Sequence, residues 1–130
     1  MREENLDHLE SGVSRPASTS GAAHRWRLGR LGEEIAAAFL ARQGVRIIAR
    51  NVGEGRGEMD IVASDDSGRF VVEVKTAMAR PDDHPRWHFT EAKARQVAGL
   101  ARSRSIGRVD LVTVVVGAGG VRIDWHRRVA

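Results

Sequence analysis

Apolar residues recur at helical spacing early in the chain and at strand spacing through most of the rest. On a helical wheel of residues 27–43, four large apolar side chains lie within about 80° of one another: Leu28, Leu31, Ile35 and Phe39. This pattern predicts an amphipathic helix that ends at Gly44. On the same wheel Glu33 falls among apolar positions and is expected to face protein, whereas Glu34 falls among polar positions and is expected to face water.

Five later segments are typical of strands, because apolar residues alternate with polar ones or form short β-branched runs. The expected strands cover residues 45–49, 58–63, 70–75, 109–116 and 121–125. The turn-like SDDSGR after the second strand contains Gly68, which accepts a positive φ, so the second and third strands are expected to form a hairpin. Between the third and fourth strands we expect a loop over residues 77–89, followed by a helix that Thr90 caps and Gly107 ends.

The length of 130 residues suits one compact domain. Because a stretch rich in Ser, Thr, Gly and Pro ends near Trp26, we expect residues 1–25 to form a flexible tail and residues 26–130 the domain. The absence of cysteine excludes disulfides and zinc–thiolate sites. The longest apolar stretch, Leu111 to Val116, is far shorter than the roughly 20 residues of a membrane helix, and the tail lacks the apolar region of a signal peptide. We therefore expect a cytoplasmic protein without a membrane segment.

The chain is basic, with a formal net charge of +4 and a sequence pI of about 10.8. Residues 1–25 carry three arginines against four acids, so residues 26–130 hold a net charge of +5. A basic domain favours anionic partners such as nucleic acid, whose phosphates release counterions on binding. A basic protein that is merely soluble is an equally frequent alternative.

Charged residues interrupt two of the expected strands in a way that suggests chemistry. Glu73 and Lys75 share one face of a strand, with Cα atoms about 6.6–6.8 Å apart, and the hairpin brings Asp60 to the same volume. Two converging carboxylates suit a hard cation such as Mg²⁺ or Mn²⁺. A lysine beside that cation can hold a water that attacks a phosphodiester. From spacing alone, an exposed cross-strand ion pair is the more frequent reading.

The sequence supplies a control for this motif. Its only lysines, Lys75 and Lys93, each stand two residues after a glutamate. Lys93 and Glu91 lie on the expected second helix, where a two-residue step turns side chains about 200° apart. That pair cannot converge on one point, whereas the strand pair can.

Several motifs resemble those of one protein family. They are Gly29-Arg-Leu-Gly32-Glu33 with Ala36 and Leu40, Arg50-Asn51, Gly57-Glu58-Met-Asp60-Ile-Val, Val72-Glu73-Val-Lys75-Thr76 and Arg108-Val-Asp110. In these motifs the chain resembles the YraN-like family of small bacterial proteins, which is similar to Holliday junction resolvases and belongs with the PD-(D/E)XK nuclease superfamily. The resemblance runs from Leu28 to His126. It implies an α/β fold with a restriction-endonuclease-like core, a central mixed sheet of about five strands flanked by helices.

The resemblance also implies roles for individual residues. Asp60 and Glu73 would be metal ligands and Lys75 the catalytic lysine, and Glu33 would match the helix-borne glutamate that completes such sites in the resolvases. We expect Asp60, Glu73 and the backbone carbonyl of Val74 to bind Mg²⁺ or Mn²⁺. Lys75 would orient the attacking water, and Glu33 would tune the metal or hold a second one.

Two further residues are expected to contact nucleic acid, namely Lys93, which matches a family lysine, and Arg56. The chain departs from the family pattern at Ala77, where members usually carry an arginine. The loop over residues 78–89 also lacks the glycine-centred pattern of the family. Both departures concern the engagement of substrate more than the binding of metal.

These observations lead to one leading hypothesis and two alternatives. The leading hypothesis is a metal-dependent endonuclease that acts on branched or structured DNA, with a symmetric homodimer as a possible assembly. The first alternative is a DNA-binding module that keeps the nuclease fold without cleaving. The second is a protein-interaction scaffold, against which the basic charge of the domain weighs.

Overall fold

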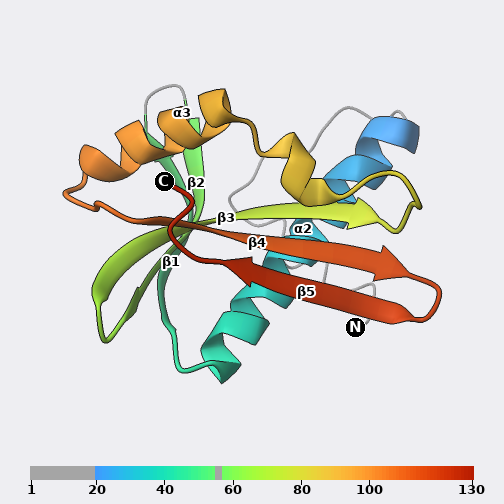
Figure 1. Cartoon of the computed structure of the whole chain (residues 1–130), viewed down its shortest axis with the longest axis horizontal. Helices are drawn as coiled ribbons and strands as arrows, with labels where there is room; N and C mark the ends of the chain where they lie inside the picture. Colours follow the sequence, from blue (N-terminus) through green and yellow to red (C-terminus); the bar gives the residue numbers. More distant parts are fainter. Residues whose placement is uncertain (1–19, 55–56) are drawn as a thin grey trace.

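Five strands form one mixed sheet in the spatial order β1-β2-β3-β4-β5 in the computed structural model, which describes residues 20–54 and 57–130 (Figure 1). The elements in chain order are α2 (Ser20–Arg42), β1 (Arg46–Glu54), β2 (Gly57–Asp65), β3 (Gly68–Met78), the 3-10 helix η1 (Pro85–His88), α3 (Glu91–Arg102), β4 (Val109–Gly117) and β5 (Gly120–His126). The predicted α/β class and the order helix, three strands, helix, two strands are confirmed.

Strand direction follows from the connections. β1, β2 and β3 form an antiparallel meander, and β4 pairs with β5 antiparallel. β3 and β4 run parallel, because η1 and α3 carry the chain across one face of the sheet between them. Gly68 in the β2–β3 turn has a φ of 112°, as its place in the predicted hairpin requires.

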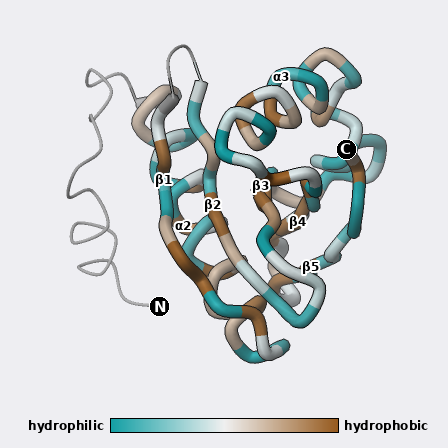
Figure 2. The backbone as a smooth tube through the Cα atoms, turned by 90° about the vertical axis from the view of Figure 1, so that its left-hand side faces the viewer, coloured by the Kyte–Doolittle hydropathy of each residue, from teal (hydrophilic) through white to brown (hydrophobic). Residues whose placement is uncertain are grey.

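The two helices cover opposite faces of the sheet, and each covers its own hydrophobic cluster. Beneath α2 lie buried side chains from the helix and the central strands: Ala36, Leu40, Ile61, Ala63, Phe70, Val72, Val74, Val112 and Val114. Beneath α3 lie Met59, Val62, Val71, Val97, Ala101, Ile106 and Val109. Figure 2 shows hydrophobic stretches of β2, β3 and β4 in the interior, between the helices. The alternation along β3 thus directs Val71 and Glu73 to the α3 face.

The element boundaries differ from the prediction at both helices, at β1 and in the predicted loop. Helix α2 begins at Ser20, so residues 20–25 of the predicted tail are helical, and residues 1–19 lie outside the described part of the chain. β1 continues to Glu54, beyond the predicted end at residue 49, and its Asn51 adopts a φ of 54° that asparagine tolerates. The predicted loop over residues 77–89 contains the end of β3 and the 3-10 helix η1.

Helix α3 begins as predicted and ends early. Oγ1 of Thr90 accepts a hydrogen bond from the backbone N–H of Lys93 at 3.2 Å, which is the expected N-cap. At the other end Ser105, rather than Gly107, adopts the left-handed conformation, with a φ of 61°. The N–H of Ile106 then donates to the carbonyl of Ala101 at 2.9 Å and closes the helix.

A buried ion pair ties the start of β4 to the rest of the sheet. Asp110 is fully buried and accepts hydrogen bonds from Arg108, from Nε1 of Trp125 and from the backbone N–H of Arg128. The guanidinium of Arg108 also lies 3.9 Å from the ring centroid of Phe70. The Arg108-Val-Asp110 motif is therefore part of the structural framework.

Among the described residues, no helix is long and apolar enough to cross a membrane.

Candidate active site

The candidate site lies where β2 and β3 separate. Their paired residues run from Asp65 and Gly68 to Ile61 and Val72. Beyond that point two side-chain carboxylates accept hydrogen bonds from backbone N–H groups. Oε1 of Glu73 accepts from the N–H of Asp60 at 3.3 Å, and Oδ2 of Asp60 accepts from the N–H of Val74 at 2.8 Å. The gap between the strands therefore holds both acids side by side.

A cavity of about 670 Å³ opens above these acids. Residues from α2, β1, β2, β3 and α3 line it: Glu33, Gly53, Gly57, Glu58, Asp60, Glu73, Val74, Lys75, Lys93 and Gln96. The structure thus brings together all the predicted site residues in the described part of the chain. Arg56, predicted to contact nucleic acid, lies outside the described residues. A cavity of this size falls within the range of ligand sites, about 300–1,000 Å³.

The acids of the cavity are held in surroundings that disfavour their charges. Glu73 is only 2 % exposed, and burial, followed by the charge of Asp60, raises its pKa to about 8. Burial also raises the pKa of Asp60, against the hydrogen bond from Val74 and the charge of Lys75. For Glu33, burial and then the charge of Asp60 raise the pKa to about 7. Burial therefore disfavours the charges of all three acids more than the surrounding cations stabilise them, and the charge of Asp60 adds to this for Glu33 and Glu73.

Both lysines of the chain lie at this cavity, although one is on a strand and the other on a helix. The charges of Lys75 and Lys93 each lower the pKa of both Asp60 and Glu73. The Glu91–Lys93 spacing on α3 is incidental, because Glu91 does not line this cavity and its side chain is 96 % exposed. Lys93 reaches the site because α3 packs against β2, the strand that carries Asp60.

The position of Glu33 depends on a contact between α2 and β1. Nη1 of Arg30, a buried arginine, donates to Oε1 of Glu33 and to Oδ1 of Asn51, both at 2.8 Å. Arg30 therefore links the helix-borne glutamate to the left-handed residue of β1. The prediction that Glu33 faces protein agrees with this contact. Glu34, which we expected to face water, is the more exposed of the two side chains, at 32 % against 14 %, and accepts from Nη1 of Arg50 at 2.7 Å.

Gly32, the residue before Glu33, allows α2 to approach β3 closely. A Cβ on Gly32 would collide with the side chain of Thr76, including its Oγ1. No larger residue fits between the helix and the strand at that point. Gly32 therefore sets the distance between Glu33 and the strand that carries Glu73 and Lys75.

Sequence reasoning missed three residues that shape the site. Arg30 stands three residues before Glu33 on a helix, and this spacing is the signal that identifies such a pair. Gln96 stands three residues after Lys93 on α3, so the same rule places it on the same side of that helix. Glu58 lines the cavity beside Asp60, and its charge raises the pKa of Asp60 and of Glu33.

The carboxylates of the cavity suit a divalent cation for which the protein supplies only some of the ligands. Within residues 20–54 and 57–130, no group of three His, Cys, Asp or Glu side chains is arranged to hold a metal ion. Asp60 and Glu73 supply two carboxylates, and Mg²⁺ is commonly bound through one or two carboxylates together with waters and substrate phosphates. The repulsion between these two buried acids is also what a cation would relieve.

Comparison with known proteins identifies relatives over most of the chain. The sequence profile of "Uncharacterised protein family UPF0102" matches residues 32–114. A UPF0102 protein of Arthrobacter sp. is 39 % identical over 111 residues, which cover 78 % of this chain and 94 % of the relative. One of Streptomyces griseus is 37 % identical, with 80 % and 95 % covered. One of Oleidesulfovibrio alaskensis is 44 % identical, with 68 % of this chain covered but only 44 % of the relative's length.

Among solved structures, SfsA of Pyrococcus furiosus in complex with Ca²⁺ shows a distant likeness. The identity is 14 %, the TM-score is 0.36, and the match covers 82 % of this chain and 64 % of that one. A likeness at this TM-score is too weak to carry a functional argument.

Proposed function

The chain belongs to the uncharacterised protein family UPF0102, the YraN-like family, and from this membership and its acidic cavity we propose that it is a metal-dependent endonuclease acting on branched or structured DNA. The observation that carries the proposal is the convergence of Asp60 and Glu73 where β2 and β3 part, with both lysines of the chain at the same cavity. A solvated ion pair accounts poorly for Glu73, which is 2 % exposed.

Asp60, Glu73 and the backbone carbonyl of Val74 would hold Mg²⁺ or Mn²⁺. Such an ion, when bound, stabilises charge on a phosphoryl oxygen and makes a bound water more acidic. The residues of the chain do the rest. Lys75 follows Glu73 by two positions on the same face of β3, where its ammonium group can orient a water toward the phosphorus.

Lys93 and Glu33 approach the cavity from the two helices. Lys93, at the first turn of α3, supplies a positive charge for a phosphate oxygen of the substrate strand. Glu33 has a pKa of about 7, so it exchanges a proton near neutral pH and can accept or return one at the reacting water. The basic character of the chain, with a net charge of +4, favours a polyanionic substrate.

The proposal is tested by incubating a four-way DNA junction and a matched linear duplex with Mg²⁺ and the purified protein. We expect cleavage by the wild type and a loss of at least about a hundredfold in Asp60→Ala, since a metal ligand is removed. Asp66→Ala, in the exposed turn of the same hairpin, is the control and should retain the wild-type rate. Equal cleavage by Asp60→Ala would overturn the proposed site. A symmetric junction also suggests a homodimer, which the mass of the protein in solution tests.

A second candidate function rests on the donor set. Because no third acid joins Asp60 and Glu73 as a ligand group within the described residues, the fold could bind DNA without cleaving it. This candidate predicts salt-sensitive binding of DNA and no Mg²⁺-dependent product. Turnover by the wild type that Asp60→Ala lacks would eliminate it.

A further inference from the structure

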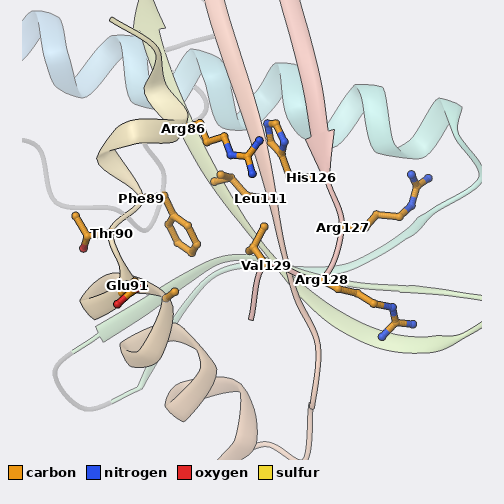
Figure 3. A pocket seen from close by; sticks show the side chains of 10 residues that line it. Arg86, Phe89, Thr90, Glu91, Leu111, His126, Arg127, Arg128 and Val129 are labelled. Atoms are coloured by element: carbon orange, nitrogen blue, oxygen red, sulfur yellow. The ribbon is translucent and has the colours of Figure 1, made fainter.

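Figure 3 shows the residues that line a second cavity, of about 520 Å³. The two cavities flank the first turn of α3, since Thr90 and Ala94 line the second one and Lys93 lines the first. Across the sheet, Glu73 is paired with Leu111 on β4, and Leu111 is paired with His126 on β5. Leu111 and His126 both line the second cavity, which therefore begins one strand away from Glu73, about 5 Å along the sheet.

The floor of this cavity is apolar and includes one aromatic ring. Leu111 is 1 % exposed, and Val129 and Phe89 are partly buried. Figure 3 shows the ring of Phe89 beside the start of α3, facing the same space as Leu111 and Val129. An apolar floor with one aromatic ring, bordered by polar groups, suits a planar, partly apolar group such as a nucleobase.

One end of the cavity is basic. Arg86 extends from η1 toward His126 (Figure 3), and the two are close enough that the charge of Arg86, after burial, lowers the pKa of His126. Oγ1 of Thr113 lies 3.2 Å from Nε2 of His126, which fixes the orientation of the ring. Arg86 and His126 together provide N–H donors for an anionic group.

The other charged residues that line this cavity lie apart from that basic end. The side chains of Arg127 and Arg128 point away from it in Figure 3, and the guanidinium of Arg127 stacks 3.7 Å from the ring centroid of Trp125. Glu91 lies at the opposite end, with its side chain 96 % exposed and 3.9 Å from Arg95. The anion-binding end therefore consists of Arg86 and His126, next to an apolar floor.

We propose that this second cavity binds one unpaired nucleotide of the DNA strand that also enters the candidate active site. The base would stack on Phe89 above Leu111, and its phosphate would accept hydrogen bonds from Arg86 and His126. This inference rests on the proposed function and adds its substrate class, namely DNA with an unpaired segment next to the point of cleavage. The basic end of the cavity suits a phosphate group. The two cavities flank the same turn of α3, so one DNA strand can reach both.

The test measures binding without metal, so that it does not depend on cleavage. Fluorescently labelled duplexes with a four-nucleotide 5′ overhang, a 3′ overhang or blunt ends are titrated with protein in EDTA, and Kd is read from anisotropy. We expect the wild type to bind one overhang duplex roughly fivefold or more tighter than the blunt duplex, because one base stacks on an aromatic ring. Phe89→Leu and Arg86→Gln should each lose this preference.

Matched variants separate the cavity from its surroundings. Trp87→Leu removes a more exposed aromatic ring, 66 % exposed, from the same 3-10 helix, and Arg102→Gln removes an exposed arginine at the far end of α3. Both should keep the preference. Circular dichroism checks that Phe89→Leu is folded, and Arg86→Gln changes only an exposed side chain. An overhang preference that survives in both Phe89→Leu and Arg86→Gln would overturn the inference, and so would equal binding of all three duplexes by the wild type.

The outcomes also distinguish this inference from the proposed function. If all duplexes bind equally but Mg²⁺-dependent cleavage requires Asp60, the nucleotide site is wrong and the active site stands. If Asp60→Ala cleaves normally while the overhang preference depends on Phe89, the proposed active site is wrong and the nucleotide site stands.

Discussion

The backbone N–H of Asp60 donates a hydrogen bond to Oε1 of Glu73 at 3.3 Å, across the gap between β2 and β3. Each acid thus occupies a place where the sheet would otherwise continue its backbone pairing. Asp60 in turn accepts from the N–H of Val74 at 2.8 Å. The end of a β-ladder has become a site with two carboxylates, and burial, followed by the charge of Asp60, raises the pKa of Glu73 to about 8.

This arrangement predicts that the ionised form of Glu73 destabilises the folded protein. The pKa of Glu73 is raised from 4.5 to about 8 in the fold, so its contribution to stability is fully present below pH 4.5 and is lost as the pH rises through 8. Glu73→Gln removes this loss, because the neutral amide can accept the same hydrogen bond. We expect the variant to gain stability relative to wild type between pH 5 and pH 9, by on the order of 2–4 kcal/mol.

Urea unfolding of both proteins at pH 5 and pH 9, without divalent metal, measures this difference. Glu58→Gln, which changes an exposed acid of the same cavity, serves as the control and should show a much smaller gain. A Glu73→Gln variant whose advantage does not grow with pH would show that Glu73 is ionised without penalty.

Gly32 and Gly29 offer a matched pair for the contact between α2 and β3. A Cβ on Gly32 would collide with Thr76, whereas a Cβ on Gly29 would meet nothing within 4 Å. Gly29→Ala should therefore stabilise the helix by about 0.5–1 kcal/mol. Gly32→Ala should destabilise the protein by about 1–3 kcal/mol. Thermal unfolding measures both, and a stabilising Gly32→Ala would mean that α2 packs less closely than described.

Arg30 is predicted to stabilise α2 against β1 through Glu33 and Asn51. Arg30→Met leaves the buried oxygens of both partners without this donor, so we expect a loss of roughly 2–4 kcal/mol. Arg27→Met, one turn earlier and exposed, should change the free energy of unfolding by less than about 0.5 kcal/mol. Denaturant unfolding compares the two variants, and equal effects would argue against a specific role for Arg30.

Asp110 is predicted to be structural, although it belongs to a family motif. It is fully buried and accepts four hydrogen bonds, two of them from Arg108. Asp110→Asn removes the buried counter-charge of Arg108, which keeps its pair with the partly exposed Asp65 at 3.1 Å, and should cost about 3 kcal/mol. Asp124→Asn, in a mostly exposed pair with Arg122, should cost less than about 1 kcal/mol. The melting temperatures of both variants decide between these expectations.

The strands and the acidic pair could be predicted because they depend on local periodicity. The alternation along β3 places Glu73 and Lys75 on one face, and the hairpin turn at Gly68 brings β2 and its Asp60 beside them. The predicted alternation of β2 fails at Asp60 itself, since Met59 packs beneath α3 whereas Ile61 packs beneath α2. The wheel of α2 identified Glu33 in the same way. These features need only residues that are near in sequence or joined by a short turn.

Features that depend on packing between distant elements could not be predicted. The contact of Arg30 with Asn51 joins residues 21 positions apart and depends on a left-handed residue within a strand. Likewise, Glu34 meets Arg50 only because α2 lies across β1. The second cavity requires the pairing of Leu111 with His126 and the placement of η1 over both, which no local pattern in the sequence specifies.

The central claim is that Asp60 and Glu73 together hold a divalent cation, and calorimetric titration of Mn²⁺ tests it most directly. The wild type, the Asp60→Asn, Glu73→Gln double variant and the Asp66→Asn control are titrated at pH 6.5 and pH 8. Because Glu73 must lose its proton, with a pKa of about 8, we expect the wild type and the control to bind Mn²⁺ more tightly at the higher pH. The double variant should not bind. Binding of unchanged affinity in the double variant would contradict the claim.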